Sequence, residues 1–184
     1  MRRFAGLVVA LLLAPSALAQ RDAVSADLSP EAAAEVFKRT LLDVCVPAAA
    51  GGGVSAMPAA QAGKLRTTND AATRKQAGAS PDDTVWDVMD GKGVVTIHER
   101  KGRCVVSVYG PPAVKTIADV AAAMEAAPDF QRLAGAPPPD GLSQNMFFGS
   151  GGRSAMVQLK GSEPGMPGHL SRFSVVTATV FVAQ

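Results

Sequence analysis

The sequence predicts an α+β protein: a mostly antiparallel sheet of about five strands with helices packed on one face, in the order α-(α)-βββ-α-ββ. Three observations lead to this fold class. Runs rich in β-branched residues alternate with glycine-bearing turns in the middle and at the end of the chain. Amphipathic helical patterns precede both groups of runs. An export signal followed by a single pair of cysteines adds a disulfide between the layers.

The first 19 residues have the features of a bacterial signal peptide. Arg2 and Arg3 give a positive start, residues 4–14 form an apolar run, and residues 17–19 carry the small side chains that signal peptidase accepts. The apolar run is shorter than the about 20 residues of a membrane-spanning helix. We therefore expect a mature chain that begins at Gln20, is periplasmic or secreted, and has no transmembrane anchor. A leader that stays attached as a surface helix is the alternative.

The mature chain has the length of one ordinary domain. Residues 20–28 are predicted as a flexible N-terminus and residues 29–184 as a single α+β domain. The full chain has 18 basic and 16 acidic residues, and two of the basic residues lie in the leader, so the mature chain is close to neutral. Because no run of lysines or arginines could follow a phosphate backbone, we expect no nucleic-acid partner.

The first helix is predicted from Ser29 to about Cys45. Ser29 is a good N-cap, and Pro30 suits the first turn. Pro47 is predicted to end the helix. Apolar side chains gather on one side at three- and four-residue spacings, namely Val36, Phe37, Leu41, Val44 and Cys45.

Residues 48–81 are predicted as a loop-rich insertion. The segment opens with three glycines, and residues 58–65 have the pattern of a short helix. Residues 66–80 have hardly any large apolar side chain and are predicted as an exposed loop.

Three strands are predicted next, at 85–89, 94–99 and 103–109. In the third strand, Cys104, Val106 and Val108 alternate onto one face.

A second helix follows Pro112, with Val114, Ile117, Ala121 and Met124 at helical spacing. Residues 134–152 are rich in proline and glycine and are predicted as a loop. The last strands are predicted at 154–160 and 173–182. The final strand is apolar on both sides, which indicates a central strand or one covered twice.

Cys45 and Cys104 are the only cysteines, and an even pair in an oxidising compartment indicates one disulfide. Closing a loop of this length stabilises a fold by about 4 kcal/mol on the chain-entropy account. The bond would place the first helix across the face that carries Cys104.

Few side chains could transfer protons near neutral pH, because the chain has only two histidines, His98 and His169. His98 and Glu99 begin like a zinc-protease motif, but position 102 is Gly102 instead of a second histidine. No serine lies in a G-x-S-x-G context, and no glycine-rich segment is a phosphate loop. The sequence therefore assigns no catalytic residue, no cofactor and no metal site, which argues against an enzyme.

The face opposite Cys104 is the candidate binding face. If the strands pair as predicted, polar side chains of several strands point to that side, although antiparallel sheets commonly leave one polar face solvated. The candidate residues are Thr96, His98, Ser107, Tyr109, Gln158, Thr177 and Thr179.

These observations favour a non-catalytic binding or interaction module of the periplasm or cell envelope. Its partner would be an envelope protein, a glycan or a small molecule. One alternative is an exported hydrolase that uses carboxylates, with Asp82, Asp83, Asp87 and Asp90 as candidates. Another is a structural subunit of an envelope assembly, with an apolar patch at residues 146–148.

Export and disulfide formation predict a defined mass. We expect the exported protein to begin at Gln20 and to be lighter by two hydrogen atoms than the reduced chain, because Cys45 and Cys104 are bonded to each other. Intact-mass spectrometry before and after reduction checks both points. Labelling of either cysteine by a thiol reagent without prior reduction would contradict the disulfide.

Overall fold

The computed structural model describes residues 28–100, 102–132, 142–150, 153–167 and 172–182. The predicted signal peptide, residues 1–19, lies outside these ranges, as do His169 and most of the predicted flexible N-terminus. Among the described residues, no helix combines the length and the apolar character needed to cross a membrane.

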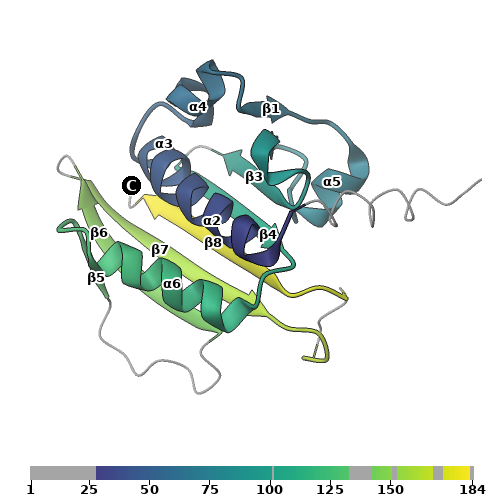
Figure 1. The fold of residues 1–184 in the computed structure, drawn as a ribbon. Coiled ribbons are helices and arrows are strands. Elements are labelled where there is room, and N and C mark those ends of the chain that lie inside the picture. Colours follow the sequence, from purple (N-terminus) through teal and green to yellow (C-terminus); the bar gives the residue numbers. More distant parts are fainter. Residues whose placement is uncertain (1–27, 101, 133–141, 151–152, 168–171, 183–184) are drawn as a thin grey trace, which may run out of the picture.

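A single eight-stranded sheet forms the centre of the molecule (Figure 1), and every neighbouring pair of strands is antiparallel. The α+β class predicted from the sequence is therefore confirmed, with eight strands instead of about five. The strands lie side by side in the order β1-β2-β3-β4-β8-β7-β6-β5. Their bounds are β1 Leu65–Thr67, β2 Thr84–Val88, β3 Val95–Arg100, β4 Arg103–Tyr109, β5 Phe130–Arg132, β6 Ser143–Ser150, β7 Arg153–Ser162 and β8 Val175–Val182.

The strands absent from the prediction are β1, β5 and β6. β1 and β5 have three residues each, too few to show an alternating pattern. β6 lies within residues 134–152, which the sequence predicts as a loop, but its backbone pairs with β5 on one side and with β7 on the other. Pairing on both sides stabilises this glycine-containing strand in spite of its weak propensity.

The segment before β2 also contains more regular structure than predicted. A 3-10 turn spans Val54–Ala56, and α4 spans Pro58–Gln61. Residues 66–80, predicted as an exposed loop, contain most of β1 and the helix α5, Ala71–Gln76. Asp70 caps α5, since its Oδ2 accepts a hydrogen bond from the Thr73 amide at 2.7 Å.

The first helix is longer than predicted. It begins with α2, Pro30–Thr40, continues through a π-helical turn, Leu41–Cys45, and ends with α3, Val46–Ala50. Pro47 does not end it: the chain stays helical through Pro47, which directly follows the π-helical turn. At the start, Ser29 Oγ accepts from the Ala32 amide at 3.2 Å.

The second helix, α6, spans Ala113–Glu125 and lies beside α2 over the same face of the sheet (Figure 1). Its buried stripe begins at Ala113, whereas Val114, which the sequence assigns to the stripe, is 49% exposed. The two helices and the sheet enclose one apolar core. Fully buried large side chains in it include Phe37, Leu41, Ile97, Ile117, Met124 and Leu159.

The two halves of the chain have the same plan. Each begins with a helix, α2 or α6, and continues with four strands that are added from one edge of the sheet towards its centre. The last strand of each half, β4 or β8, meets the other at the centre, where Val106 lies opposite Ala178. The final strand is therefore central, as its apolar character on both sides predicts.

The predicted disulfide is present. Cys45, in the π-helical turn, is bonded to Cys104 of β4, with 5.4 Å between their Cα atoms. Both cysteines are buried in the core. The bond connects the first helix to a central strand and fixes which face of β4 is the inner one.

Gly161 sets how closely α6 approaches the sheet. A Cβ atom on Gly161 would lie 2.8 Å from Ala113 Cβ and 2.9 Å from Ile117 Cδ1. We expect Gly161→Ala to lower the free energy of unfolding by about 1–3 kcal/mol, as overpacking of a core does. Urea unfolding followed by circular dichroism measures the effect.

Ile117→Val provides the matched test, because it removes the Cδ1 atom from this contact. In the Gly161→Ala background, Ile117→Val should cost less stability than it does in the wild-type chain. Equal costs in the two backgrounds would show that the Gly161 contact does not limit the packing of α6.

Candidate functional site

The strand register places every residue of the predicted binding face on the outer side of the sheet, opposite Cys104. Thr96 lies opposite Ser107, and Ser107 lies opposite Thr177. Directly paired residues share a face, as do residues two apart in one strand. The complete set is Thr96 and His98 of β3, Ser107 and Tyr109 of β4, Gln158 of β7, and Thr177 and Thr179 of β8.

Part of this face is covered. Residues 68–83, which connect β1 to β2 and include α5, bond to its polar side chains, and we call this segment the strap. The hydroxyl of Tyr109 donates to the carbonyl of Gln76, and His98 makes a hydrogen bond with the backbone of Ala77. Thr96, His98 and Ser107 are each at most 5% exposed. They form a buried polar layer, whereas Gln158 and Thr177 are half-buried.

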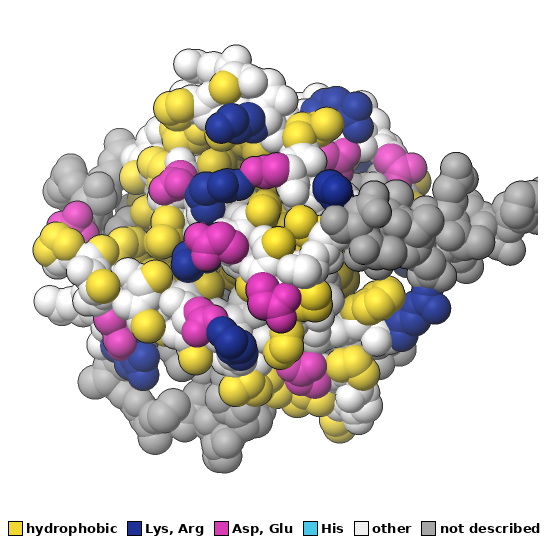
Figure 2. Space-filling view, in the orientation of Figure 1, with side chains coloured by type: hydrophobic (Ala, Val, Ile, Leu, Met, Phe, Trp, Pro, Cys, Tyr) yellow, Lys and Arg dark blue, Asp and Glu magenta, His cyan; other side chains and the backbone are white. Residues whose placement is uncertain are grey.

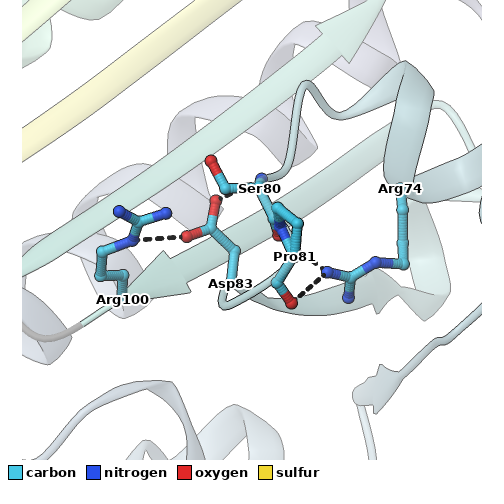
Figure 3. A network of polar contacts seen from close by, with 5 residues as sticks. All are labelled: Arg74, Ser80, Pro81, Asp83 and Arg100. Atoms are coloured by element: carbon cyan, nitrogen blue, oxygen red, sulfur yellow. Dashed lines mark hydrogen bonds and ion pairs between the residues drawn. The ribbon is translucent and has the colours of Figure 1, made fainter.

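One end of the strap is fixed by a polar network around Asp83 (Figure 3). Asp83 Oδ1 accepts from Arg100 Nε at 2.7 Å, and its Oδ2 accepts from the Ser80 amide at 2.8 Å. Arg74 closes the network by donating to the carbonyls of Ser80 and Pro81. Burial alone would raise the pKa of Asp83, but the hydrogen bonds from Ser80 and Arg100 outweigh it and lower the pKa below the ordinary value of 3.8.

The polar layer under the strap has unsatisfied atoms. His98 Nε2 and Thr96 Oγ1 are buried and have no hydrogen-bond partner. Burial lowers the pKa of His98 below its ordinary value of 6.5, Asp83 partly opposes this, and Arg103 and Arg100 add to it. Burial also raises the pKa of Tyr109. At neutral pH the layer therefore contains a neutral imidazole and a neutral phenol.

A cleft of about 900 Å³ lies beside the disulfide, at the end of α3 and the adjoining ends of β3 and β4. The backbone of residues 51–53 and Cys104 line it together with Val182 of β8. The lining residues with polar side chains are Ser55, Asp82, Thr84, Glu99, Arg100 and Arg103. No motif in the sequence marks this site.

Glycines shape the wall of the cleft. Gly52 and Gly53 have φ angles of +92° and +72°, a conformation that side-chain-bearing residues rarely adopt, and they allow the chain to turn sharply after α3. The turn brings Val54 to the sheet, where its amide donates to Glu99 Oε2 at 2.7 Å. Glu99 thus attaches the glycine segment to β3.

Two arginines lie opposite each other at the end of the hairpin that borders the cleft. Arg100 and Arg103 are register partners on β3 and β4. Arg100 contacts Asp83 through Nε, so its terminal nitrogens keep their donors for a ligand. The Arg103 guanidinium carbon lies 5.9 Å from the ring centre of Phe181. Like charges directly opposite each other are destabilising, and a bound anion would relieve that repulsion.

A smaller hollow of about 250 Å³ separates α2 from α6. Four of the five charged side chains around it are paired within their own helices, Lys38 with Glu35 and Lys115 with Asp119, and the fifth is Glu31. Figure 2 shows acidic and basic side chains interspersed over this face of the molecule. The hollow therefore offers a ligand fewer available charges than the cleft does.

The carboxylates considered for hydrolysis do not form a pair with each other. Asp83 is bonded to Arg100, Asp87 lies 3.9 Å from Arg66, and Asp90 contacts Arg39. Asp82 lines the cleft with Glu99. Within the described part of the chain, no group of three or more histidine, cysteine or acidic residues could hold a metal ion.

Comparison with known proteins assigns no family to the chain. No protein-family model, no curated protein and no solved structure matches it.

The network around Asp83 predicts a loss of stability on substitution. We expect Asp83→Asn to lower the free energy of unfolding by about 1–3 kcal/mol at pH 7, because a buried acceptor loses its charge and a hydrogen-bond site. The folded-state pKa of Asp83 is lowered. Its contribution is therefore complete above the unfolded-state pKa of about 3.9 and is lost as the pH falls through the folded-state value.

Urea unfolding of both chains between pH 7 and pH 2.5 measures this dependence. The stability difference between wild type and Asp83→Asn should shrink below about pH 3.9. Asp82→Asn is the matched control. Asp82 is the exposed neighbour of Asp83, and its carboxylate should contribute less than about 0.5 kcal/mol to the free energy of unfolding. A difference that does not change with pH would show that the charge of Asp83 does not stabilise the strap.

Proposed function

We propose that this protein is an exported, non-catalytic binding module that holds a small polar molecule with an acidic group in the cleft beside the disulfide. The volume of the cleft, about 900 Å³, is the observation that carries the proposal. It lies within the range of about 300–1,000 Å³ that is common for small-molecule sites. The disulfide is compatible with an oxidising compartment outside the cytosol.

The acidic group of the ligand is inferred from the two arginines. A guanidinium binds a carboxylate or a phosphate through two parallel hydrogen bonds, and the cross-strand position of Arg100 and Arg103 allows both to reach one anion. Asp82, Ser55 and Thr84 supply acceptors and hydroxyls for the rest of the ligand. Polar groups of both signs favour a ligand with hydroxyl or amino groups in addition to its acid.

The walls of the cleft favour binding because several of them are already fixed. The disulfide connects Cys104 to the first helix, Glu99 bonds to the Val54 amide, and Asp83 orients Arg100. A site whose side chains are ordered before binding loses less conformational entropy when the ligand enters.

The hydrolase remains a second candidate because Asp82 and Glu99 line the same cleft. Two carboxylates in one cleft are the minimum for acid–base hydrolysis of a glycoside. Glu99 is already hydrogen-bonded to the Val54 amide, which favours a structural role for it. The patch proposed for an assembly subunit, residues 146–148, has side chains outside the described part of the structure.

A ligand panel tests the proposal. Small sugar acids, amino acids, phosphate esters and neutral sugars are titrated into the mature, oxidised protein by NMR and calorimetry. We expect the acidic members of the panel to bind. Arg103→Gln should lower their affinity about tenfold or more, because a charged hydrogen bond contributes about 1.5–3 kcal/mol. Arg103 is preferred to Arg100 as the probe, since Arg100 also holds the buried Asp83.

Arg66→Gln is the matched control. It removes one arginine from the exposed edge strand β1, outside the cleft, and should leave affinity unchanged. Equal binding of acidic and neutral members, or an equal loss in both variants, would contradict the assignment of the arginines. Hydrolysis of a glycoside added to the panel, if it stops in Asp82→Asn, would favour the enzyme.

A further inference from the structure

The strap covers a polar surface with few apolar contacts of its own. Within residues 68–83, only Ala77 and Asp83 are buried. The strap bonds to His98 and Tyr109 of this face, where Thr96, His98 and Ser107 are buried, and two of these three side chains have buried atoms without hydrogen-bond partners. Most buried polar atoms in proteins are paired, and an unpaired one costs free energy. The closed position of the strap therefore carries a cost that an open position, with water at these atoms, would remove.

We propose that the strap is a proton-sensitive lid, which opens when His98 takes up a proton and so exposes the polar outer face to water. The geometry points to His98 because it bonds directly to the strap, at the backbone of Ala77. Its other ring nitrogen, Nε2, is buried without a partner. A proton on Nε2 would add a second donor where no acceptor is present, and a charge where water is excluded.

The charged groups around His98 determine how strongly protonation is opposed. Asp83, at the end of the strap, favours a charged imidazole, but this carboxylate is already bonded to Arg100 and to the Ser80 amide. Arg100 on β3 and Arg103 on β4 both oppose the additional positive charge. Tyr109, which also bonds to the strap, is neutral over the same pH range because burial raises its pKa.

The direction of the pH effect follows from linkage. Burial lowers the pKa of His98 in the closed structure, whereas an open strap would return it to the ordinary value of about 6.5. Above that value the closed form is fully favoured. As the pH falls below it, the open form binds the proton first, and the opening constant rises by up to about tenfold per pH unit until the closed-state pKa is reached.

Hydrogen exchange between pH 8 and pH 5 tests the proposal on the mature, oxidised protein. After correction for intrinsic exchange rates, protection of the α5 amides should be constant above pH 7 and should fall by up to about tenfold per pH unit below about 6.5. Amides of β4 and β8 should keep their protection, which separates lid opening from global unfolding. The measurement needs no ligand for the cleft and is independent of the proposed function.

Two variants distinguish the histidines. His98→Gln should make α5 protection independent of pH, because glutamine does not titrate, whereas His169→Gln should behave like the wild-type chain. Retention of the wild-type pH trend in His98→Gln would overturn the proposal, as would constant α5 protection in the wild type. An NMR titration gives a second measurement if His98→Gln fails to fold: a His98 pKa at or above 6.5 in the native chain would also overturn it.

Discussion

The bond between Cys45 and Cys104 is the constraint on which the rest of the architecture depends. It joins the π-helical turn of the first helix to β4, at the centre of the sheet. Because side chains alternate along a strand, fixing Cys104 inward also fixes Ser107 and Tyr109 outward. One covalent contact thus determines which face of the sheet receives the helices and which face receives the strap.

In each half of the chain, successive strands run from one edge of the sheet to its centre. This arrangement explains which strands are long and buried and which are short. β4 and β8 are paired on both sides and carry buried side chains on both faces, whereas the edge strands β1 and β5 have three residues each. Short edges limit pairing with other chains. The sequence shows no repeat although the two halves share one plan, because a shared order of elements requires similar patterns of burial and not similar residues.

Much of the fold could be predicted because it depends on local patterns. Alternation placed Cys104, Val106 and Val108 on one face, and the helical spacing of Val36, Phe37 and Leu41 marked a stripe that is buried. β6 could not be predicted, because its stability comes from two neighbours distant in sequence. The sequence predicts an exposed loop for most of the strap because the segment has hardly any large apolar side chain. Hydrogen bonds and an ion pair, in place of apolar contacts, attach it to the sheet.

The candidate sites differ in how far the sequence could predict them. Strand alternation alone predicts which residues lie on the outer face. It does not predict the burial of His98, because that burial depends on where the strap lies. The cleft combines a glycine segment, the end of a hairpin and the last strand, which are distant in sequence. Only the folded chain brings them together. A glycine run followed much later by two arginines on either side of a turn is too common a pattern to have identified it.

The position of the disulfide divides the molecule into a covalent ring and an open chain. The ring runs from residue 45 to residue 104. It contains the glycine wall of the cleft, the whole strap and both arginines of the hairpin. The second half of the protein, from α6 to β8, lies outside the ring: the peptide chain continues into it from Cys104, and packing and strand pairing hold it against the ring. Reduction would therefore open the ring that carries the strap and most residues of the cleft, while every non-covalent contact of the second half could still form.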